Sequence, residues 1–200
     1  MSARTTLGEM SQSPSTSELS FSQLVFSDFV RYRPATTPSW PKILLRIPTL
    51  PGLLASIILR AQQCLYRSGH ERLAHSLRTP ANVLVGADFA AGMTVGTGFM
   101  LAHPVGVTIG LGLTIGDNVS FAGGVTCAAR YYEGPEDIEQ EYATICDGAV
   151  IGAYAVLVGG VRIGTNAMVG ANSVVLSDVP DNAVVMGSPA RQIGTRDVIA

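Results

Sequence analysis

The sequence of 200 residues is long enough for one domain with a substantial hydrophobic core. Its formal net charge is -2 and only 14% of its residues are charged, which gives no electrostatic reason to expect binding to nucleic acid or to an anionic membrane. The three cysteines, Cys64, Cys127 and Cys146, form no C-x-x-C pair, so they predict reduced, buried thiols in a cytoplasmic protein and no metal site.

Residues 1–20 are rich in serine and threonine and predict a flexible N-terminal tail. They lack the apolar core of a signal peptide. The most apolar early run, residues 50–59, contains Pro51 and is far shorter than the ~20 residues that cross a bilayer. We therefore expect a cytoplasmic location and no membrane contact.

Residues 21–80 have the apolar spacing of amphipathic helices. A helical pattern has apolar residues at Leu24, Val25, Phe29 and Val30 with polar residues between them, and a second helical pattern follows a proline-rich bend. Prolines divide this region into short helices, and they lie at Pro34, Pro38, Pro41, Pro48 and Pro51.

After Pro80, apolar residues recur every six positions, with a slip of two residues after Val107. A period of six is neither helical nor the alternation of a simple strand, so it indicates an internal repeat. The repeated positions are Val83, Phe89, Val95, Leu101 and Val107, then Ile109, Ile115, Phe121 and Cys127, then Ile145, Ile151, Leu157, Ile163, Val169 and Val175.

Each six-residue unit predicts one short strand and one turn, and three strands would complete one coil of a triangular prism with the repeated residue pointing inward. Small residues suit the corners of such a prism. They follow the inward residue by one position at Gly96, Gly110, Gly116, Gly152, Gly164 and Gly170, and by four positions at Ala149, Ala155, Ala167 and Ser173. The predicted fold is mainly β, a parallel β-helix over residues 81–188.

The repeat is interrupted at residues 128–144, where charged and aromatic residues and a Gly-Pro pair predict a projecting loop. Residues 189–200 follow the last repeat as a C-terminal tail.

The hexads resemble those of the left-handed parallel β-helix in hexapeptide-repeat acyltransferases, and the stretch DVPDNAVVMGSPARQIG resembles the end of that domain. More narrowly, residues 86–110, GADFAAGMTVGTGFMLAHPVGVTIG, resemble the serine O-acetyltransferase segment VDIHPxAxIGxGxxxDHxxGxVIG. The resemblance covers roughly residues 55–195. It implies a left-handed β-helix with acetyl-CoA as the acyl donor.

Acyl transfer to an alcohol needs a base for the hydroxyl proton and donors for the oxyanion. An imidazole suits the first task because it can take up and release a proton near neutral pH. The resemblance implies that His103 is this base and that Asp88, fifteen residues earlier as in the family, orients it. The alternative for His103 is a packing role at a corner, and we interpret His70 and His75 as surface or packing residues.

In the family, the projecting loop ends GDRHPKI, and its arginine and histidine contact the amino-acid substrate. Here the loop ends QEYATI, so Glu141 and Tyr142 take these positions, and Ala102 replaces the aspartate before the base. Glu141 favours a cationic or polyhydroxylated acceptor, and Tyr142, with Tyr131 and Tyr132, is suited to stacking on a sugar. An exposed acid without a role and packing tyrosines are the alternatives.

The family binds coenzyme A in a groove between neighbouring β-helices, lined by backbone groups of the later coils. By position, the resemblance implicates Ala129, Gly152, Ala153, Gly170 and Ala171, with Arg191 available to the phosphates.

Together these features favour an acetyl-CoA-dependent O-acetyltransferase acting on a sugar or secondary-metabolite alcohol, ahead of serine. One alternative is an inactive trimeric scaffold or regulatory binding module. A zinc-dependent carbonic anhydrase on the same fold needs three histidines, which the single histidine of the repeats cannot supply. The resemblance implies a homotrimer with sites at the subunit boundaries, and a hexamer joined through residues 21–77 is the alternative.

Overall fold

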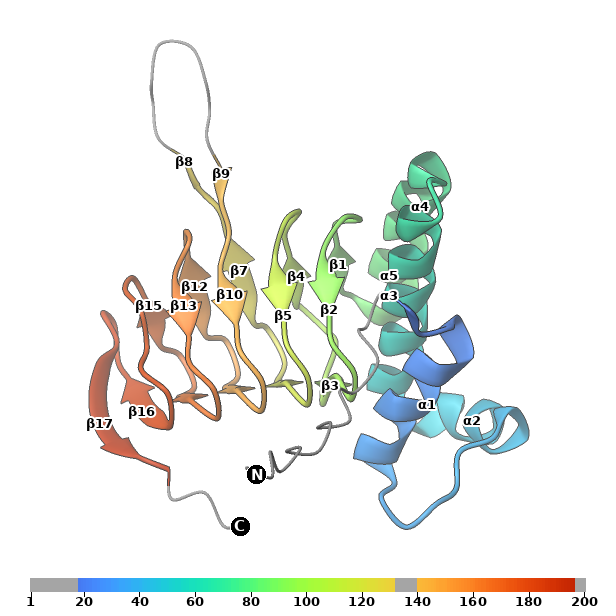
Figure 1. The fold of residues 1–200 in the computed structure, drawn as a ribbon, viewed down its shortest axis with the longest axis horizontal. Helices are drawn as coiled ribbons and strands as arrows, with labels where there is room; N and C mark the ends of the chain where they lie inside the picture. Colours follow the sequence, from blue (N-terminus) through green and yellow to red (C-terminus); the bar gives the residue numbers. More distant parts are fainter. Residues whose placement is uncertain (1–17, 132–139, 197–200) are drawn as a thin grey trace, which may run out of the picture.

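The computed structural model describes residues 18–131 and 140–196, and in it a group of helices packs against one end of a parallel β-helix (Figure 1). Three predicted segments lie at least partly outside the described residues. These are most of the N-terminal tail (1–17), the tip of the projecting loop (132–139) and the last residues of the C-terminal tail (197–200).

The helical region begins at Phe21 and consists of short helices separated at prolines, as predicted. Pro41 is the second residue of its helix and Pro51 is the first, where the missing N–H of proline costs no hydrogen bond. The elements are α1 (Phe21–Tyr32), α2 (Trp40–Arg46), the 3₁₀ helix η2 (Ile47–Thr49), α3 (Pro51–Arg67), α4 (Glu71–Ser76) and α5 (Arg78–Val85).

Helix α5 continues past residue 80, where the sequence predicts the start of the repeats. Pro80 is the third residue of this helix, so it lies in the first turn, where proline is tolerated. The inward position predicted for Val83 is wrong, because this side chain is 78% exposed on α5. The series of inward residues therefore begins at Phe89.

The β-helix has three sheets, which we call A, B and C. Successive strands pass from A to B to C and then to the next coil, and neighbours within a sheet are parallel except for the last strand of C. Sheet A contains β1 (Asp88–Phe89), β4 (Thr108–Ile109), β7 (Thr126–Ala128), β12 (Val156–Val158) and β15 (Val174–Val175). Sheet B contains β2 (Thr94–Val95), β5 (Thr114–Ile115), β10 (Thr144–Ile145) and β13 (Arg162–Ile163). Sheet C contains β3 (Met100–Leu101), β6 (Ser120–Phe121), β11 (Val150–Ile151), β14 (Met168–Val169), β16 (Ala183–Met186) and β17 (Arg191–Thr195).

Two further strands, β8 (Arg130–Tyr131) and β9 (Gln140–Glu141), pair antiparallel at the base of the projecting loop, which leaves the prism between sheets A and B (Figure 1). At the other end of the chain, β17 lies within the range predicted as a C-terminal tail. It pairs antiparallel with β16 instead.

The predicted inward residues from Phe89 to Val175 form the core of the prism. In sheet A, the strand register aligns Phe89, Ile109, Cys127, Leu157 and Val175 in one column, and each is at most 4% exposed. Full burial of one such apolar side chain stabilises the fold by about 1.5–3 kcal/mol. The six-residue period thus corresponds to one column of stacked apolar side chains on each sheet. The prediction of a β-helix is confirmed.

Two kinds of small residue shape the corners. Those at Ala149, Ala155, Ala167 and Ser173 are fully buried, as a tight corner requires. The glycines after the inward residues are needed for close packing between coils, since a Cβ on Gly152 would lie 2.6 Å from the amide nitrogen of Ala171. The left-handed backbone lies instead three positions after the inward residue, at Gly92, Gly98, Gly112, Asn118, Gly124, Gly148, Tyr154, Asn166, Asn172 and Asn182.

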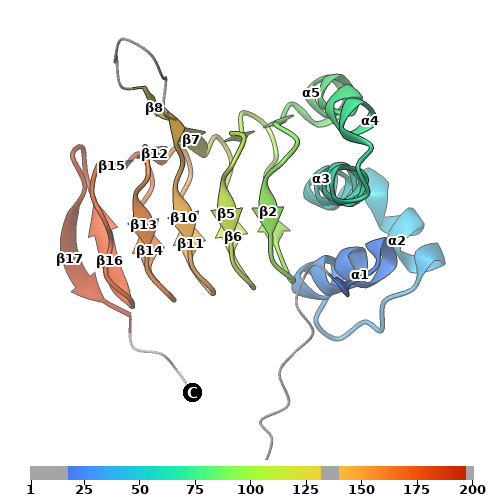
Figure 2. The same cartoon turned by 45° about the horizontal axis from the view of Figure 1, so that its top comes forward.

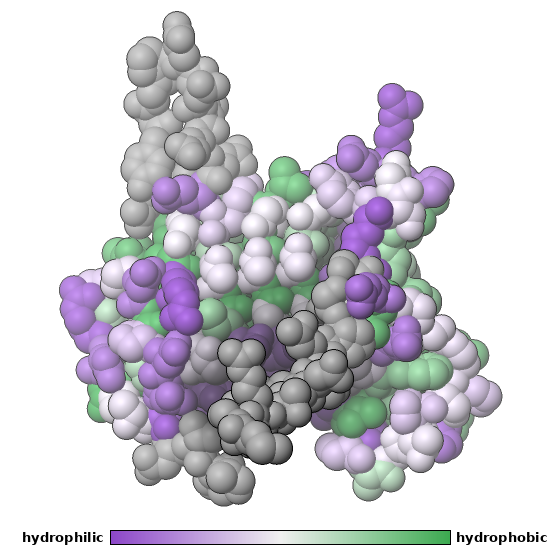
Figure 3. Space-filling view, in the orientation of Figure 1, coloured by the Kyte–Doolittle hydropathy of each residue, from purple (hydrophilic) through white to green (hydrophobic). Residues whose placement is uncertain are grey.

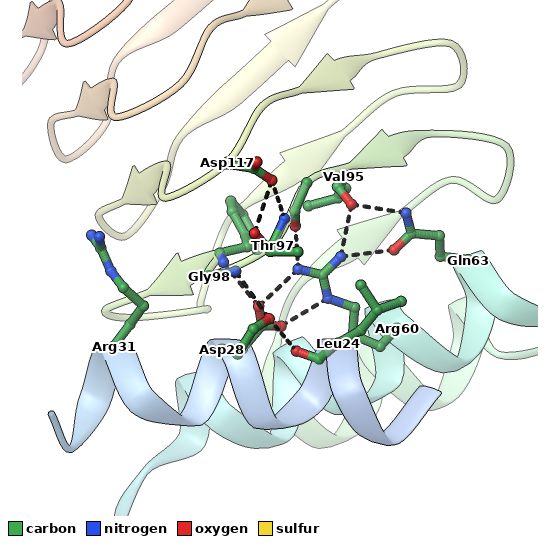
Figure 4. Close-up of polar contacts among 12 residues, drawn as sticks. Leu24, Asp28, Arg31, Arg60, Gln63, Val95, Thr97, Gly98 and Asp117 are labelled. Carbon is green, nitrogen blue, oxygen red and sulfur yellow. Dashed lines mark hydrogen bonds and ion pairs between the residues drawn. The ribbon is translucent and has the colours of Figure 1, made fainter. Parts of the chain in front are cut away.

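A buried ion pair joins the helices to the first coil (Figure 4). Arg60 on α3 and Asp28 on α1 are both fully buried, and Arg60 Nε and Nη2 donate to the two Asp28 oxygens over 2.8 and 2.7 Å. Its other N–H groups donate to the Gln63 side chain and to the carbonyls of Val95 and Gly96. All five guanidinium N–H groups therefore have acceptors.

Asp28 also accepts a hydrogen bond from the N–H of Phe99 over 2.8 Å, and the neighbouring Ser27 hydroxyl accepts one from the N–H of Gly98. Both amides directly precede strand β3. The network therefore fixes α1 against the segment that leads into β3, as the packing of α1 beside the first coil in Figure 2 shows.

The outer surface of the prism is weakly polar. Sheet B presents Thr94, Thr114 and Thr144 outward on neighbouring strands. Figure 3 shows nearly neutral surface over the middle of the prism and more hydrophilic surface toward both of its ends. None of the helices in the described part of the chain is long and apolar enough to cross a membrane.

We predict that Asp28→Ala lowers the free energy of unfolding by about 3–5 kcal/mol, because it leaves the Arg60 charge buried without its partner. Urea denaturation followed by circular dichroism measures this loss. The control is Arg162→Ala, which breaks the exposed pair with Asp181 and should cost far less stability than the loss of the buried pair. Equal losses in the two variants would contradict a structural role for the buried pair.

Candidate functional site

A cavity of about 420 Å³ lies where the helices meet the first coil of the β-helix. His103, the histidine predicted as a base, lines it and is exposed. The cavity walls come from α1 (Arg31, Tyr32), from η2 and the start of α3 (residues 49–52), and from β3 and the turn after it (Met100, Ala102, His103).

His103 lies on an enlarged corner between sheets C and A. Six residues separate β3 from β4, whereas four separate β6 from β7 one coil later. This insertion is the two-residue slip seen in the sequence. A Cβ on Gly123, in the next coil, would lie 3.2 Å from His103 Cβ, so the small residue there leaves room for the backbone that carries the imidazole.

Two contacts hold the helices against β3. The Tyr32 hydroxyl donates to the carbonyl of Leu101 over 2.9 Å and accepts from its N–H over 3.0 Å. Gly52, the second residue of α3, approaches so closely that an added Cβ would collide with the same carbonyl. The residue before Ala102 and His103 is thus fixed by both helices.

Tyr32 and His103 bring a phenol and an imidazole to the cavity surface. Burial raises the pKa of Tyr32 to about 12, so its phenol stays protonated at neutral pH. The imidazole of His103 can accept a proton from a hydroxyl group placed in the cavity. Within the residues that the structure describes, no three His, Cys, Asp or Glu side chains lie together in a way that could hold a metal ion.

Asp88 has a different partner from the one expected. Its two carboxylate oxygens accept from Arg78 on α5, with Arg78 Nη2 2.6 Å from Oδ2 and a second, shorter contact from Nε. This Arg78 side chain lowers the pKa of the Asp88 carboxyl. In the described part of this one chain, no hydrogen bond joins Asp88 to His103.

The corner of His103 is nevertheless close to the backbone near Asp88. The N–H of Gly106 donates to the carbonyl of Gly86 over 2.8 Å, and a Cβ on Gly86 would lie 3.5 Å from the Cα of Val105. Asp88 begins the strand that follows Gly86.

Four of the residues predicted to bind coenzyme A lie along the same edge of the prism as His103, the edge between sheets C and A. Gly152 and Ala153 follow β11, and Gly170 and Ala171 follow β14. The N–H groups of Gly152 and Gly170 donate to the neighbouring coil, at Val169 and Val185. Among the described residues no group accepts a hydrogen bond from the N–H of Ala153 or of Ala171, so both N–H groups can donate to a ligand.

Of the remaining two, Ala129 lies on another edge, and Arg191 lies near the last coil of the same edge. Ala129 stands between β7 and β8, at the base of the projecting loop. Arg191 is exposed on β17, where its Nη1 donates to the carbonyl of Ala190. Arg191 is paired in register with Met186, whose side chain lies over Gly170.

The two loop residues predicted to bind substrate are on the edge between sheets A and B. The ring of Tyr142 packs over the preceding coil, since a Cβ on Gly110 would lie 2.6 Å from its Cε1. Glu141 lies beside Gly160, since a Cβ added to Gly160 would lie 3.2 Å from the Cβ of Glu141. One chain therefore does not bring Glu141 and Tyr142 to His103 (Figure 1). Tyr132 lies outside the described residues.

The sequence interpretation missed Arg31 and Tyr32. A helical signal was present, because these residues follow Ser27 and Asp28 by four positions and so lie on the same face of α1. All four side chains bond to residues of the first coils.

A family model described as "Bacterial transferase hexapeptide (six repeats)" matches residues 142–177. The chain is 37% identical over 148 residues to "Serine acetyltransferase 4" of Arabidopsis thaliana, which covers 74% of this chain and 41% of the relative. It is 32% identical over 165 residues to the serine acetyltransferase of Helicobacter pylori, covering 82% of this chain and 91% of the relative.

The fold is similar to the crystal structure of serine acetyltransferase from Neisseria gonorrhoeae, with a TM-score of 0.74 and 32% sequence identity. That similarity covers 88% of this chain and 66% of the Neisseria chain. The chain thus spans about two fifths of the Arabidopsis relative and nearly all of the Helicobacter one.

We predict that Gly52→Ala destabilises the protein, although alanine is the better helix former by about 1 kcal/mol. The added methyl group collides with Leu101 and must push α3 from β3, at a cost of about 1–3 kcal/mol. Thermal unfolding measures the stability, and hydrogen exchange at the Leu101 N–H measures the displacement.

The control is Gly194→Ala on β17, where an added Cβ meets nothing within 4 Å. A melting temperature unchanged or raised by Gly52→Ala would show that the helices do not depend on this close approach.

Proposed function

Since the chain belongs to the serine acetyltransferase family of hexapeptide-repeat transferases, we propose that it transfers an acetyl group from acetyl-CoA to a hydroxyl group of a small molecule. The observation that carries this proposal is the exposed imidazole of His103 on the wall of the cavity between the helices and β3. Acetyl-CoA supplies the activated acetyl group. His103 takes the proton of the acceptor hydroxyl as its oxygen attacks the thioester carbon. The carbon–sulfur bond then breaks, and the imidazolium returns the proton to the sulfur, so coenzyme A leaves as the thiol.

Asp88 belongs to this proposal as a positioning residue. Arg78 holds it at the start of β1, and the backbone beside it contacts the corner that carries His103. A carboxylate fixed there stabilises the imidazolium that forms during proton transfer.

The edge between sheets C and A supports coenzyme A binding. Ala153 and Ala171 have small side chains and N–H groups without an acceptor in the described part of the chain, and they lie on the edge that begins with His103. These amides suit the polar groups of an extended ligand that runs along the edge. Arg191, exposed beside Met186 over Gly170, lies near the same edge, whereas Ala129, at the base of the projecting loop, fits the proposal less directly.

The names of the relatives favour L-serine as the acceptor, ahead of the sugar or secondary-metabolite alcohol expected from the loop. A sugar alcohol is the second candidate because the loop carries Glu141, an acid, where the family motif has an arginine. Mass spectrometry of the products formed from acetyl-CoA and a panel of amino acids, sugars and alcohols decides between them.

The proposed assembly is a homotrimer. In one chain the described base of the projecting loop and His103 lie on different edges, and a neighbouring β-helix would bring the base of its loop toward the imidazole. Light scattering should give the mass of three chains, and the mass of six would indicate the hexamer. A cytoplasmic location is part of the same proposal, and it is supported by the free thiols of Cys64, Cys127 and Cys146.

We predict that His103→Ala lowers the rate of acetyl transfer by about 10²–10⁴-fold, because the acceptor hydroxyl loses its base. The fold should be retained, since this side chain is exposed. Thiol release from acetyl-CoA in the presence of L-serine or the acceptor found by mass spectrometry measures the rate.

The matched control is His75→Ala, which removes an exposed histidine from α4 and should leave the rate unchanged. Full activity in the His103→Ala variant would refute the role of His103. Absence of turnover with every acceptor, together with no binding of coenzyme A by calorimetry, would favour the scaffold alternative.

A further inference from the structure

One side chain among the described residues of the cavity carries a permanent charge. Of the described residues that line the cavity, Arg31 is the only arginine or lysine, and none is an aspartate or glutamate. Arg31 comes from the last turn of α1, and His103 comes from the turn after β3. Arg31 and His103 therefore line one space of about 420 Å³, large enough for a small metabolite.

The charge of Arg31 is not neutralised by the described part of the chain. Nη2 donates to Ser120 Oγ over 2.8 Å and Nη1 approaches Asn118 Oδ1 at 3.5 Å, and both acceptors are uncharged. These contacts hold the guanidinium in place and use two of its five N–H groups. The other three can donate to a ligand, and a planar carboxylate matches their geometry.

Arg60 provides an internal comparison, since it also lies on a helix that packs against the first coils. Its five N–H groups all have acceptors within the fold, and Asp28 neutralises its charge. Arg60 is fully buried, whereas Arg31 is only partly buried and opens on a cavity. The Arg60 guanidinium thus has an acceptor for every N–H group and a carboxylate that neutralises its charge. The Arg31 guanidinium keeps N–H groups and a charge that a ligand can bind.

The sequence differences around the site agree with this assignment. The arginine of the family loop is replaced by Glu141, so this position no longer supplies a cation for a carboxylate. Ala102, which lines the cavity beside His103, stands where the family motif has an aspartate. An acid at this position would compete for Arg31, and alanine removes that competition.

We propose that Arg31 recognises the carboxylate of the acceptor, so that the protein takes a small hydroxy-carboxylate whose hydroxyl group lies at His103. This inference rests on the proposed acetyl transfer and adds to it the residue that sets specificity. It favours L-serine or another hydroxy acid over a neutral sugar alcohol.

Binding measured by NMR titration tests the proposal without requiring turnover. The probes are two matched pairs, L-serine with L-serinamide and D-glycerate with glycerol, in which only the first member carries a carboxylate. The wild-type protein should prefer the carboxylate in at least one pair. Arg31→Gln should weaken that binding by about tenfold or more and leave binding of the partner without a carboxylate unaffected, and Arg31→Lys should lie between the wild-type protein and Arg31→Gln.

The control variant is Arg33→Gln, an exposed arginine at the end of α1 that does not line the cavity. Unchanged carboxylate binding in Arg31→Gln, or an equal loss for both members of a pair, would overturn the proposal. The same would follow if the wild-type protein preferred neither carboxylate. Carboxylate binding that depends on Arg31 without acetyl transfer would refute the proposed function and leave the recognition by Arg31 standing.

Discussion

The buried pair of Asp28 and Arg60 is the interaction on which the arrangement of the site depends. A buried arginine is tolerated only when every N–H group has an acceptor and the charge has a partner, and both conditions are met by groups from α1, α3 and the first coil together. The network therefore favours one relative position of these three elements. The same position places Tyr32 and Gly52 on Leu101 and so sets the wall opposite His103.

The β-helix supplies the second constraint. A strict six-residue period produces corners of four residues between strands. The insertion at His103 widens one corner next to the helices and leaves the strand register of the following coils intact. Regular coils thus provide a rigid frame, and the enlarged corner holds His103, the proposed base.

The sequence predicted the fold well because one physical cause, burial of every sixth residue, leaves a direct trace in the order of residues. It failed at Val83 because a helix can place an apolar residue six positions before the first inward residue by chance. The prediction identified the small residues at the corners but not the residues that have a left-handed backbone. Five residues other than glycine have the left-handed backbone there, four of them asparagines, and this recurring asparagine was a signal within the sequence.

The site was less predictable because its contacts join distant parts of the chain. Hydropathy gives no sign that Arg60 is buried or that Asp28, 32 residues away, is its partner. The motif led to His103, but the cavity around it is made partly by α1, to which the resemblance does not extend. For Asp88, the motif gave the position, and only the structure showed that Arg78 holds the carboxylate.

The strand β17 has a consequence for how the molecule behaves in a crowded solution. A stack of parallel strands ends in a row of backbone groups that another chain can extend, and repeated extension of this kind produces fibres. Here the chain turns back on itself, and β17 occupies the free side of β16 in the opposite direction, while helices cover the first coil. The coils can therefore associate side by side in a closed ring without growing end to end.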